Sequence, residues 1–146
     1  MTADLPRDPV VRRARRAEVR RLALLEEAGF DEPWSAESLA REIEGPHTLV
    51  LVAAARRGDP PAGFAAYRLV PGGEEAELLR LAVEPAARRQ GLARALLDEG
   101  RRRLAEAGCE RCFLEVRADN RAALALYDAT GFHRIGRRAG YYGPGA

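Results

Sequence analysis

Apolar and polar positions fall into segments of two kinds along this chain. Short apolar runs predict strands, and apolar residues three or four apart predict helices. We expect strands at 9–14, 48–55, 62–70, 74–83, 111–116 and 132–138, and helices at 16–28, 36–44, 91–107 and 121–130. Short turns between the strands from 48 to 83 predict an antiparallel meander, and the helical crossover before 111 predicts a parallel pair. The fold class is therefore mixed α/β, with antiparallel N-terminal strands, a parallel central pair, and a single domain over residues 1–146.

The stretch from Leu78 to Ala107 organises the rest of the chain. Its apolar run ends at Val83, and Pro85 cannot continue a sheet ladder. A basic loop follows, and then a helix with an apolar stripe on which Gly100 permits close packing on the sheet. A strand, an Arg/Gly loop and a helix N-terminus direct backbone N–H groups and two guanidiniums at one point. This arrangement predicts an anion site, with phosphate as the favoured anion; an ordinary strand–loop–helix joint is the alternative.

Composition narrows the class of protein. The apolar share of 47% and the charged share of 32% are typical of a globular protein. No run reaches the length of a membrane span, and the N-terminus lacks the apolar core of a signal peptide, so we expect a cytoplasmic protein without a membrane partner. A net charge of +2 does not indicate a nucleic-acid partner. All 24 basic residues are Arg, which excludes a catalytic lysine.

An arginine cluster and a cysteine pair each have a structural and a functional interpretation. Six of the ten residues from Arg12 to Arg21 are Arg, which suits either a solvated helix face, the favoured reading, or contact with RNA or an acidic partner. Cys109 and Cys112 have the spacing of half a zinc site or of a redox pair. Because the two histidines are far apart in sequence and no second cysteine pair exists, we expect a turn cysteine, a strand cysteine and no metal.

Three polar residues in the C-terminal third are candidates for chemistry. Glu115 lies near the C-terminal end of the expected parallel strand, where ligands bind in open α/β sheets. Shielding would raise its pKa and suit it to accept a proton, while a salt bridge with Arg117 or Arg80 is an equal alternative. Tyr127 is a proton donor or a half-buried tyrosine, seven residues after Asn120, the expected cap of its helix.

The aromatic residues elsewhere leave alternatives open. Trp34 stands at the entry of the helix that Ser35 is expected to cap, and it is either a core anchor, which we favour, or part of a substrate groove. Tyr141 and Tyr142, near the chain end, indicate a binding surface or an ordered tail.

Two blocks of this sequence resemble the GNAT superfamily of N-acetyltransferases. LLRLAVEPAARRQGLARALL resembles the acetyl-CoA motif, with Arg88, Gly91 and Ala93 matching the signature Q/R-x-x-G-x-G/A, and FLEVRADNRAALALYDATGF resembles the second conserved block. The resemblance covers nearly the whole chain. Within the superfamily, PWS, the LEVR-to-GF block and RR-x-x-YY are similar to the branch that acetylates the N-terminal alanine of a small-subunit ribosomal protein.

The resemblance implies a cofactor and a set of roles. Acetyl-CoA is the donor and coenzyme A the product. Backbone groups of the central strand's end bind the pantetheine arm, the loop and helix start bind the pyrophosphate, and a further side chain contacts the cofactor arm; these residues are, in that order, Leu81, Ala82 and Val83, then Arg88, Arg89, Gln90, Gly91, Leu92, Ala93 and Arg94, then Asn120. Glu115 is implied as general base and Tyr127 as general acid of a direct transfer in a ternary complex, without an acyl-enzyme.

The acceptor has alternatives. The favoured acceptor is the α-amine of a protein N-terminus; a small amine such as a polyamine, aminoglycoside or amino acid is the second, and a non-catalytic acyl-CoA-binding module is the third. Members of the resembling branch continue past the tyrosine pair with a final apolar strand, whereas this chain stops at Ala146. We therefore expect a sheet without that strand, or a homodimer in which a second copy covers the exposed C-terminal edge.

Overall fold

The computed structural model describes residues 1–3, 8–70 and 72–133 of the chain. Its Cα positions divide the chain into two units, Met1–Phe113 and Leu114–Ala146. The first unit contains β1 (Val10–Arg13), a 3₁₀ turn η1 (Arg16–Glu18), α1 (Val19–Gly29), α2 (Ala36–Glu44), β2 (Thr48–Ala54), β3 (Gly63–Leu69), β4 (Glu75–Val83), a 3₁₀ turn η2 (Pro85–Ala87), α3 (Leu92–Glu106) and β5 (Arg111–Phe113). In the second unit the described helix is α4 (Arg121–Ala129).

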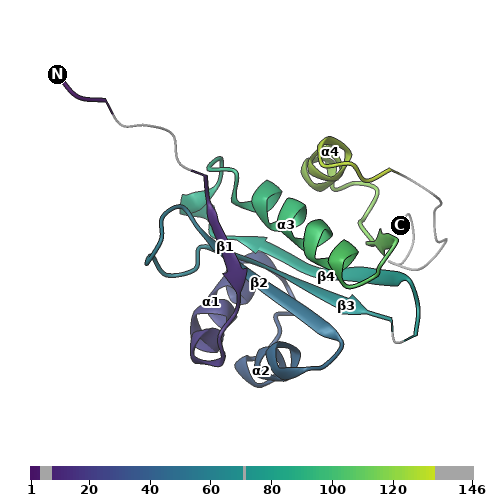
Figure 1. Cartoon of the computed structure of the whole chain (residues 1–146). Helices are drawn as coiled ribbons and strands as arrows, with labels where there is room; N and C mark the ends of the chain where they lie inside the picture. The colour runs from purple at the N-terminus through teal and green to yellow at the C-terminus, as the bar shows by residue number, and fades with distance from the viewer. Residues whose placement is uncertain (4–7, 71, 134–146) are drawn as a thin grey trace. The chain divides into compact units, whose positions relative to one another are not determined.

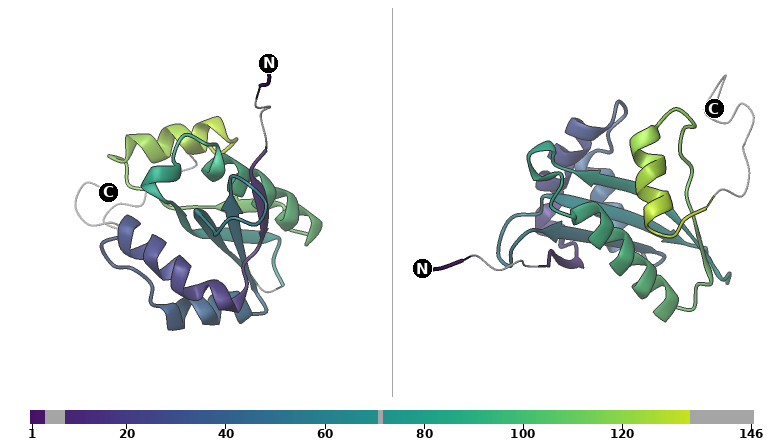
Figure 2. Two further views of the ribbon diagram at one scale, coloured as in Figure 1. Left: turned by 90° about the vertical axis from the view of Figure 1, so that its left-hand side faces the viewer. Right: turned by 90° about the horizontal axis from the view of Figure 1, so that it is seen from above.

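The strands of the first unit form one sheet in the order β1-β2-β3-β4-β5. Neighbouring strands from β1 to β4 are antiparallel, and β4 and β5 are parallel. The predicted meander and the predicted parallel pair across a helical connection are both confirmed. Figures 1 and 2 show α1 and α2 on one face of the sheet and α3 on the other. The fold class predicted from the hydrophobic pattern is therefore confirmed.

Each face of the sheet has its own apolar layer. On the α1/α2 face, Leu22 and Leu39 are fully buried against Val52 and Phe64. Burial of side chains of this size stabilises the fold by about 1.5–3 kcal/mol each. A single buried acidic residue, Glu26, joins this layer with none of its surface exposed. The described part of the chain has no helix that is long and apolar enough to cross a membrane.

On the other face, α3 lies unusually close to β3. Tyr67 is fully buried there, and its hydroxyl donates to the Leu96 carbonyl at 3.1 Å. A Cβ atom added at Gly100 would lie 2.2 Å from that hydroxyl oxygen. The prediction that Gly100 permits close packing of this helix on the sheet is confirmed.

The prediction that the fifth strand runs from residue 111 to 116 is wrong. β5 ends at Phe113, whose partner is Glu77. Two residues further on, β4 contains a bulge, because the register with β3 passes from Leu78 to Arg80 and leaves Leu79 as the extra residue. A bulge bends its strand and increases its twist, so the parallel ladder stops just before it. Glu115 therefore lies beyond the strand.

The Arg-rich segment before and within α1 is tied into the fold by ion pairs. The predicted helix from residue 16 begins as η1 and becomes α-helical at Val19. Three of the segment's arginines pair with glutamates at 2.7, 2.7 and 2.8 Å: Arg12 with Glu18, Arg16 with Glu44, and Arg21 with Glu84. These contacts favour the structural reading of the segment over an RNA-binding one.

Part of the sequence prediction falls on residues that the structure does not describe. The last strand was expected at 132–138; Phe132 and His133 are described and are not in a strand, and the rest of that range, with Tyr141 and Tyr142, lies outside the described residues. A homodimer through that edge stays a prediction.

Candidate functional site

The joint between β4 and α3 has an unusual backbone. After η2, Arg88 is extended, but Arg89 has a φ of 68° and Gly91 a φ of 77°. Left-handed geometry costs about 1–2 kcal/mol for a residue with a side chain and almost nothing for glycine. A left-handed arginine in an exposed loop is therefore a feature that a function must justify.

The N-terminus of α3 is left open by this loop. Gly91 is its N-cap and supplies no side-chain hydrogen bond, and the first turn contains no acidic residue. Among the described hydrogen bonds, none is donated by the backbone N–H of Leu92, Ala93 or Arg94. These donors and the positive end of a 15-residue helix dipole make this helix start a candidate anion-binding site.

Arginines lie next to these donors in the sequence. Arg88, Arg89 and Gln90 are exposed, and within the described contacts neither arginine makes an ion pair. The Arg94 guanidinium lies 3.9 Å from Asp98, a distance at which the pair is weak. The loop thus offers two guanidiniums and several backbone donors to the phosphates of a ligand.

The edge of β4 next to this loop is open. Leu81, Ala82 and Val83 pair on one side with Ala65, Phe64 and Gly63 of β3. On the other side β5 pairs with Glu75–Glu77 alone. Within the first unit's described strands, the backbone of Leu81–Val83 therefore has a free side that an extended ligand arm with amide groups fits as an added strand.

The second unit contains the remaining predicted site residues. Asn120 is the N-cap of α4, as predicted, and its Oδ1 accepts from the Ala123 N–H at 3.1 Å. Its amide NH₂ remains as a donor, which suits a contact with a cofactor amide or hydroxyl. Glu115 is exposed and follows β5 by two residues.

Tyr127 lies within α4, where its ring meets that of Phe132 edge-on, with centroids 5.6 Å apart. Burial raises the pKa of the Tyr127 phenol above its ordinary value of 10. The phenol is therefore fully protonated at neutral pH and suits a proton donor.

The structure brings one group of the predicted residues together. The strand end, the loop and the helix start, from Leu81 to Arg94, are contiguous parts of the first unit. Glu115, Asn120 and Tyr127 belong to the second unit, and their catalytic and cofactor roles stay predictions. The expected positions of the two cysteines are confirmed, with Cys109 outside and Cys112 inside a strand, and burial raises the pKa of the Cys112 thiol to about 11. This thiol is a poor nucleophile at neutral pH.

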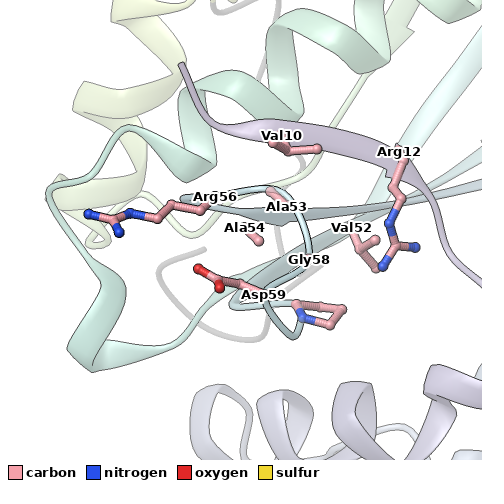
Figure 3. Close-up of a pocket in the computed structure, with 9 residues that line it drawn as sticks. Val10, Arg12, Val52, Ala53, Ala54, Arg56, Gly58 and Asp59 are labelled. Carbon is pink, nitrogen blue, oxygen red and sulfur yellow. The ribbon is translucent and has the colours of Figure 1, made fainter. Parts of the chain in front are cut away.

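A small hollow at the β1 edge of the sheet is a second concave feature. Figure 3 shows Val10, Arg12, Arg56 and Asp59 around it. Arg12 already pairs with Glu18, and the hollow lies on the strand farthest in the sheet order from β5. It therefore does not extend the site at the open edge of β4.

Two features of the site were missed by sequence reasoning. The bulge at Leu79 depends on pairing between strands and leaves no local mark in the sequence. The second feature is the contact between the buried Glu26 and Arg80, at 3.3 Å. A signal for Glu26 existed, because it follows the inward-facing Leu22 by four residues and so lies on the same stripe of α1.

The sequence of the chain matches a known family. A model described as the acetyltransferase (GNAT) family matches residues 16–132. The chain therefore belongs to this family and is an acyltransferase of the class that uses acetyl-CoA as donor. Residues of the β4–α3 joint fit that donor, because they offer open backbone groups for its arm and cations for its phosphates.

Comparisons with individual proteins show which members of the family the chain resembles. The chain is 40% identical to the N-alpha-acetyltransferase RimI of Mycobacterium tuberculosis, over 97% of this chain and 89% of that protein. It is 39% identical to the uncharacterized protein ML0378 of Mycobacterium leprae over 86% of this chain, but spans only 35% of that protein. The crystal structure of the ribosomal-protein-S18-alanine N-acetyltransferase from Escherichia coli has a TM-score of 0.79 at 32% identity, covering 92% of this chain and 83% of that one. These matches confirm the resemblance drawn from the sequence.

Proposed function

We propose that the chain transfers the acetyl group of acetyl-CoA to the α-amine of a protein N-terminus, with an alanine-starting ribosomal protein as the first candidate acceptor. The observation that carries the proposal is the β4–α3 joint, where a left-handed Arg89, an uncapped α3 and an open β4 edge adjoin. Support for the acceptor comes from the relatives, which include an N-alpha-acetyltransferase and a ribosomal-protein-alanine N-acetyltransferase.

The donor supplies an acetyl thioester, and the residues of the chain place it and move protons. The N–H groups at the start of α3 and the guanidiniums of Arg88 and Arg89 hold the phosphates, and the free side of Leu81–Val83 aligns the arm. An acceptor α-amine has a pKa of about 7.7–8 and must lose a proton before it can attack. Glu115 accepts that proton, either directly or through water.

The transfer forms one C–N bond and breaks one C–S bond. The electron pair of the C–S bond leaves with sulfur, and Tyr127 donates the proton that converts the leaving thiolate to a thiol. The attacking nitrogen gives up its second proton as the amide forms, and this proton restores the Tyr127 phenol. Burial raises the pKa of this phenol, so the phenol carries its proton at neutral pH but is a weaker acid than an exposed tyrosine. Neither cysteine forms an acyl-enzyme in this scheme, and the high pKa of Cys112 supports direct transfer.

The test is a mass-spectrometric assay with acetyl-CoA and a panel of peptides that differ only in their first residue. We expect a mass increase of about 42 Da, the mass of an acetyl group, on the amine that titrates near 8, and the highest rate for peptides starting with Ala. Glu115→Gln is expected to lower kcat by roughly 10²–10⁴-fold, the usual contribution of general base catalysis. Glu110→Gln, at an exposed position just before β5, is the matched control.

Two results would overturn parts of the proposal. If no peptide is acetylated while acetyl-CoA still binds, the acceptor is not a protein N-terminus. If Glu115→Gln and Glu110→Gln are equally active, Glu115 is not the base.

A further inference from the structure

Glu26, Phe30 and Trp34 form a cage around the end of a side chain from β4. Glu26, near the C-terminal end of α1, has no exposed surface, and its Oε1 accepts from the Trp34 backbone N–H at 2.6 Å. Its Oε2 is buried and has no hydrogen-bond partner among the described residues. An unsatisfied buried carboxylate oxygen costs the fold about 1–3 kcal/mol or more, so it needs an explanation.

Arg80 fills this cage with a cation. Its guanidinium carbon lies 4.2 Å from the centroid of the Phe30 ring and 4.7 Å from that of Trp34. Its Nε is 3.3 Å from Glu26 Oε1, and its Nη2 donates to the Glu32 carbonyl at 3.0 Å. Two aromatic faces, a carboxylate and a carbonyl oxygen are the groups with which proteins recognise organic cations.

The guanidinium of Arg80 leaves some hydrogen-bonding groups of the cage unpaired. Arg80 Nε has no hydrogen bond of acceptable geometry among the described residues, and Glu26 Oε2 is also left without a donor. The cage therefore has more hydrogen-bonding capacity than its present occupant uses. Since 19% of the Arg80 side chain is exposed, the cage is not sealed from solvent.

The position of Arg80 connects the cage with the reaction. It directly follows the bulge residue Leu79 and directly precedes Leu81, the first residue of the open edge. A donor with its phosphates at the start of α3 and its arm along Val83 to Leu81 brings its acetyl end toward Arg80. An acceptor amine that reaches the thioester there approaches next to the cage.

We infer that Arg80 is a specificity-determining residue, which occupies the cation cage of Glu26, Phe30 and Trp34 from within the chain and denies it to cationic groups of the acceptor. The inference rests on the proposed function for its link to the acceptor. It selects acceptors with a neutral group beside the reacting amine and excludes polyamines and other polycations. The existence of the cage as a cation site is a separate statement that can be tested without any acetyl transfer.

The binding test uses Arg80→Ala and the probe ethylguanidinium, which has the charged group that the variant lacks. Trp34 is the single tryptophan, so its fluorescence reports on the cage. We expect a saturable fluorescence change in Arg80→Ala, none in the parent protein, and none with urea, which is a neutral molecule of similar shape. Adding Glu26→Gln to Arg80→Ala should weaken the binding of the probe roughly tenfold, since the carboxylate is lost.

Folding of each variant is checked by circular dichroism, and Arg80→Met is the second variant because it keeps an apolar stem in the cage. A folded Arg80→Ala protein that shows no saturable response to ethylguanidinium overturns the cage as a cation site, and Arg80→Met, whose stem fills the cage, is expected to show none.

The specificity test compares two Ala-starting peptides, one with a neutral second residue and one with lysine there. In Arg80→Ala we expect the ratio of kcat/KM for the lysine peptide over the neutral peptide to rise roughly tenfold through KM, with the KM for acetyl-CoA changed by less than about twofold. Arg80→Lys, which keeps a cation, is expected to retain the parent ratio. An unchanged ratio in Arg80→Ala, with ethylguanidinium still bound, overturns the specificity role alone. If the parent acetylates neither peptide, the proposed function fails, and the fluorescence titration still decides on the cage.

Discussion

The segments that lead into α2 and α3 differ in how they treat the unpaired backbone N–H groups at the start of each helix. Before α2, Ser35 has ordinary extended geometry and its hydroxyl accepts from the Ser38 N–H at 3.1 Å. Before α3, Gly91 is left-handed and supplies no cap. A side-chain cap contributes about 1 kcal/mol to a helix. The chain therefore lacks that stabilisation at α3, where under the proposed function a phosphate of the donor takes the place of the cap.

The charges at the two helix starts differ in the same sense. The first turn of α2 contains Glu37, which interacts favourably with the positive end of the helix dipole. The first turn of α3 contains no acid, and Arg88 and Arg89 precede it. A helix start that lacks both a cap and an acid, and that arginines precede, leaves its backbone donors available to an anion. The difference between the two helix starts therefore supports α3, and not α2, as the proposed phosphate site.

The largest expected effect comes from removing the two cations of the open joint. Replacing Arg88 and Arg89 together by Ala should raise the Kd for acetyl-CoA about 100-fold, because each charge-assisted hydrogen bond contributes about 1.5–3 kcal/mol. Isothermal titration calorimetry measures this change. Arg56→Ala with Arg57→Ala, an exposed arginine pair in the β2–β3 turn, is the matched control and should change Kd less than about twofold. Equal effects of the two double variants would contradict the site.

The next largest effect tests the left-handed backbone. Gly91→Ala places a Cβ in open space but at a φ of 77°, so only backbone strain opposes it. At about 1–2 kcal/mol, this strain should weaken acetyl-CoA binding roughly tenfold. Gly29→Ala, also in open space but without a positive φ, is the control and should leave the Kd unchanged. A Gly91→Ala protein with the parent Kd would show that the loop's backbone geometry is not needed.

Substitutions at Ser35, the N-cap of α2, should change the stability of the protein and not its affinity for acetyl-CoA. Ser35→Ala removes the cap of α2 and should lower the free energy of unfolding by about 1 kcal/mol, measured by urea denaturation. Ser35→Asp keeps an oxygen acceptor and should recover most of the loss. The Kd for acetyl-CoA should stay at the parent value in both variants. A higher Kd in Ser35→Ala would contradict the proposal that the start of α3, and not that of α2, takes part in binding.

The smallest effect concerns Glu26, which accepts from the Trp34 N–H just before that cap. Burial raises the pKa of the Glu26 carboxyl, while the Trp34 hydrogen bond and Arg80 oppose the rise. A raised pKa means that the folded state binds the proton more tightly than the unfolded state. The stabilisation is therefore complete below the ordinary pKa near 4.5 and is lost as the pH rises through the higher folded-state value.

The measurement is the free energy of unfolding as a function of pH for the parent and for Glu26→Gln. The parent should lose stability relative to Glu26→Gln as the pH rises from about 4 through the raised pKa. Glu27→Gln removes the same charge from an exposed position on α1 and controls for net charge. If the difference in the free energy of unfolding between the parent and Glu26→Gln does not vary over this pH range, burial does not raise the pKa of this carboxyl.

Sequence reasoning succeeded where the deciding signal is local. The bounds of α2 and its Ser35 cap follow from a cap residue, an apolar spacing and a Gly-Pro stop that all lie within a dozen positions. The open joint was also predictable, because a proline, two arginines and a glycine stand in one short segment. Its left-handed Arg89 was not predictable, since an arginine adopts this geometry only when the surrounding fold requires it.

Sequence reasoning failed where the deciding contact joins distant segments. The pattern RCFLEV alternates regularly to Val116, yet β5 stops at Phe113, because the bulge at Leu79 bends its partner strand. Arg80 and Glu26 are likewise brought together only by the packing of α1 on the sheet. The roles of Glu115 and Tyr127 stay predictions drawn from the family resemblance.

The missing side chain at Gly100 has an evolutionary consequence. Because a Cβ there would lie 2.2 Å from the Tyr67 hydroxyl oxygen and 2.3 Å from its ring carbon Cζ, neither position can change freely while the other is kept. A larger residue at 100 requires a smaller one at 67, and a smaller residue at 67 leaves a void beneath the helix. Related sequences should therefore vary at these two positions together, and this linked pair fixes the height of α3 above the sheet.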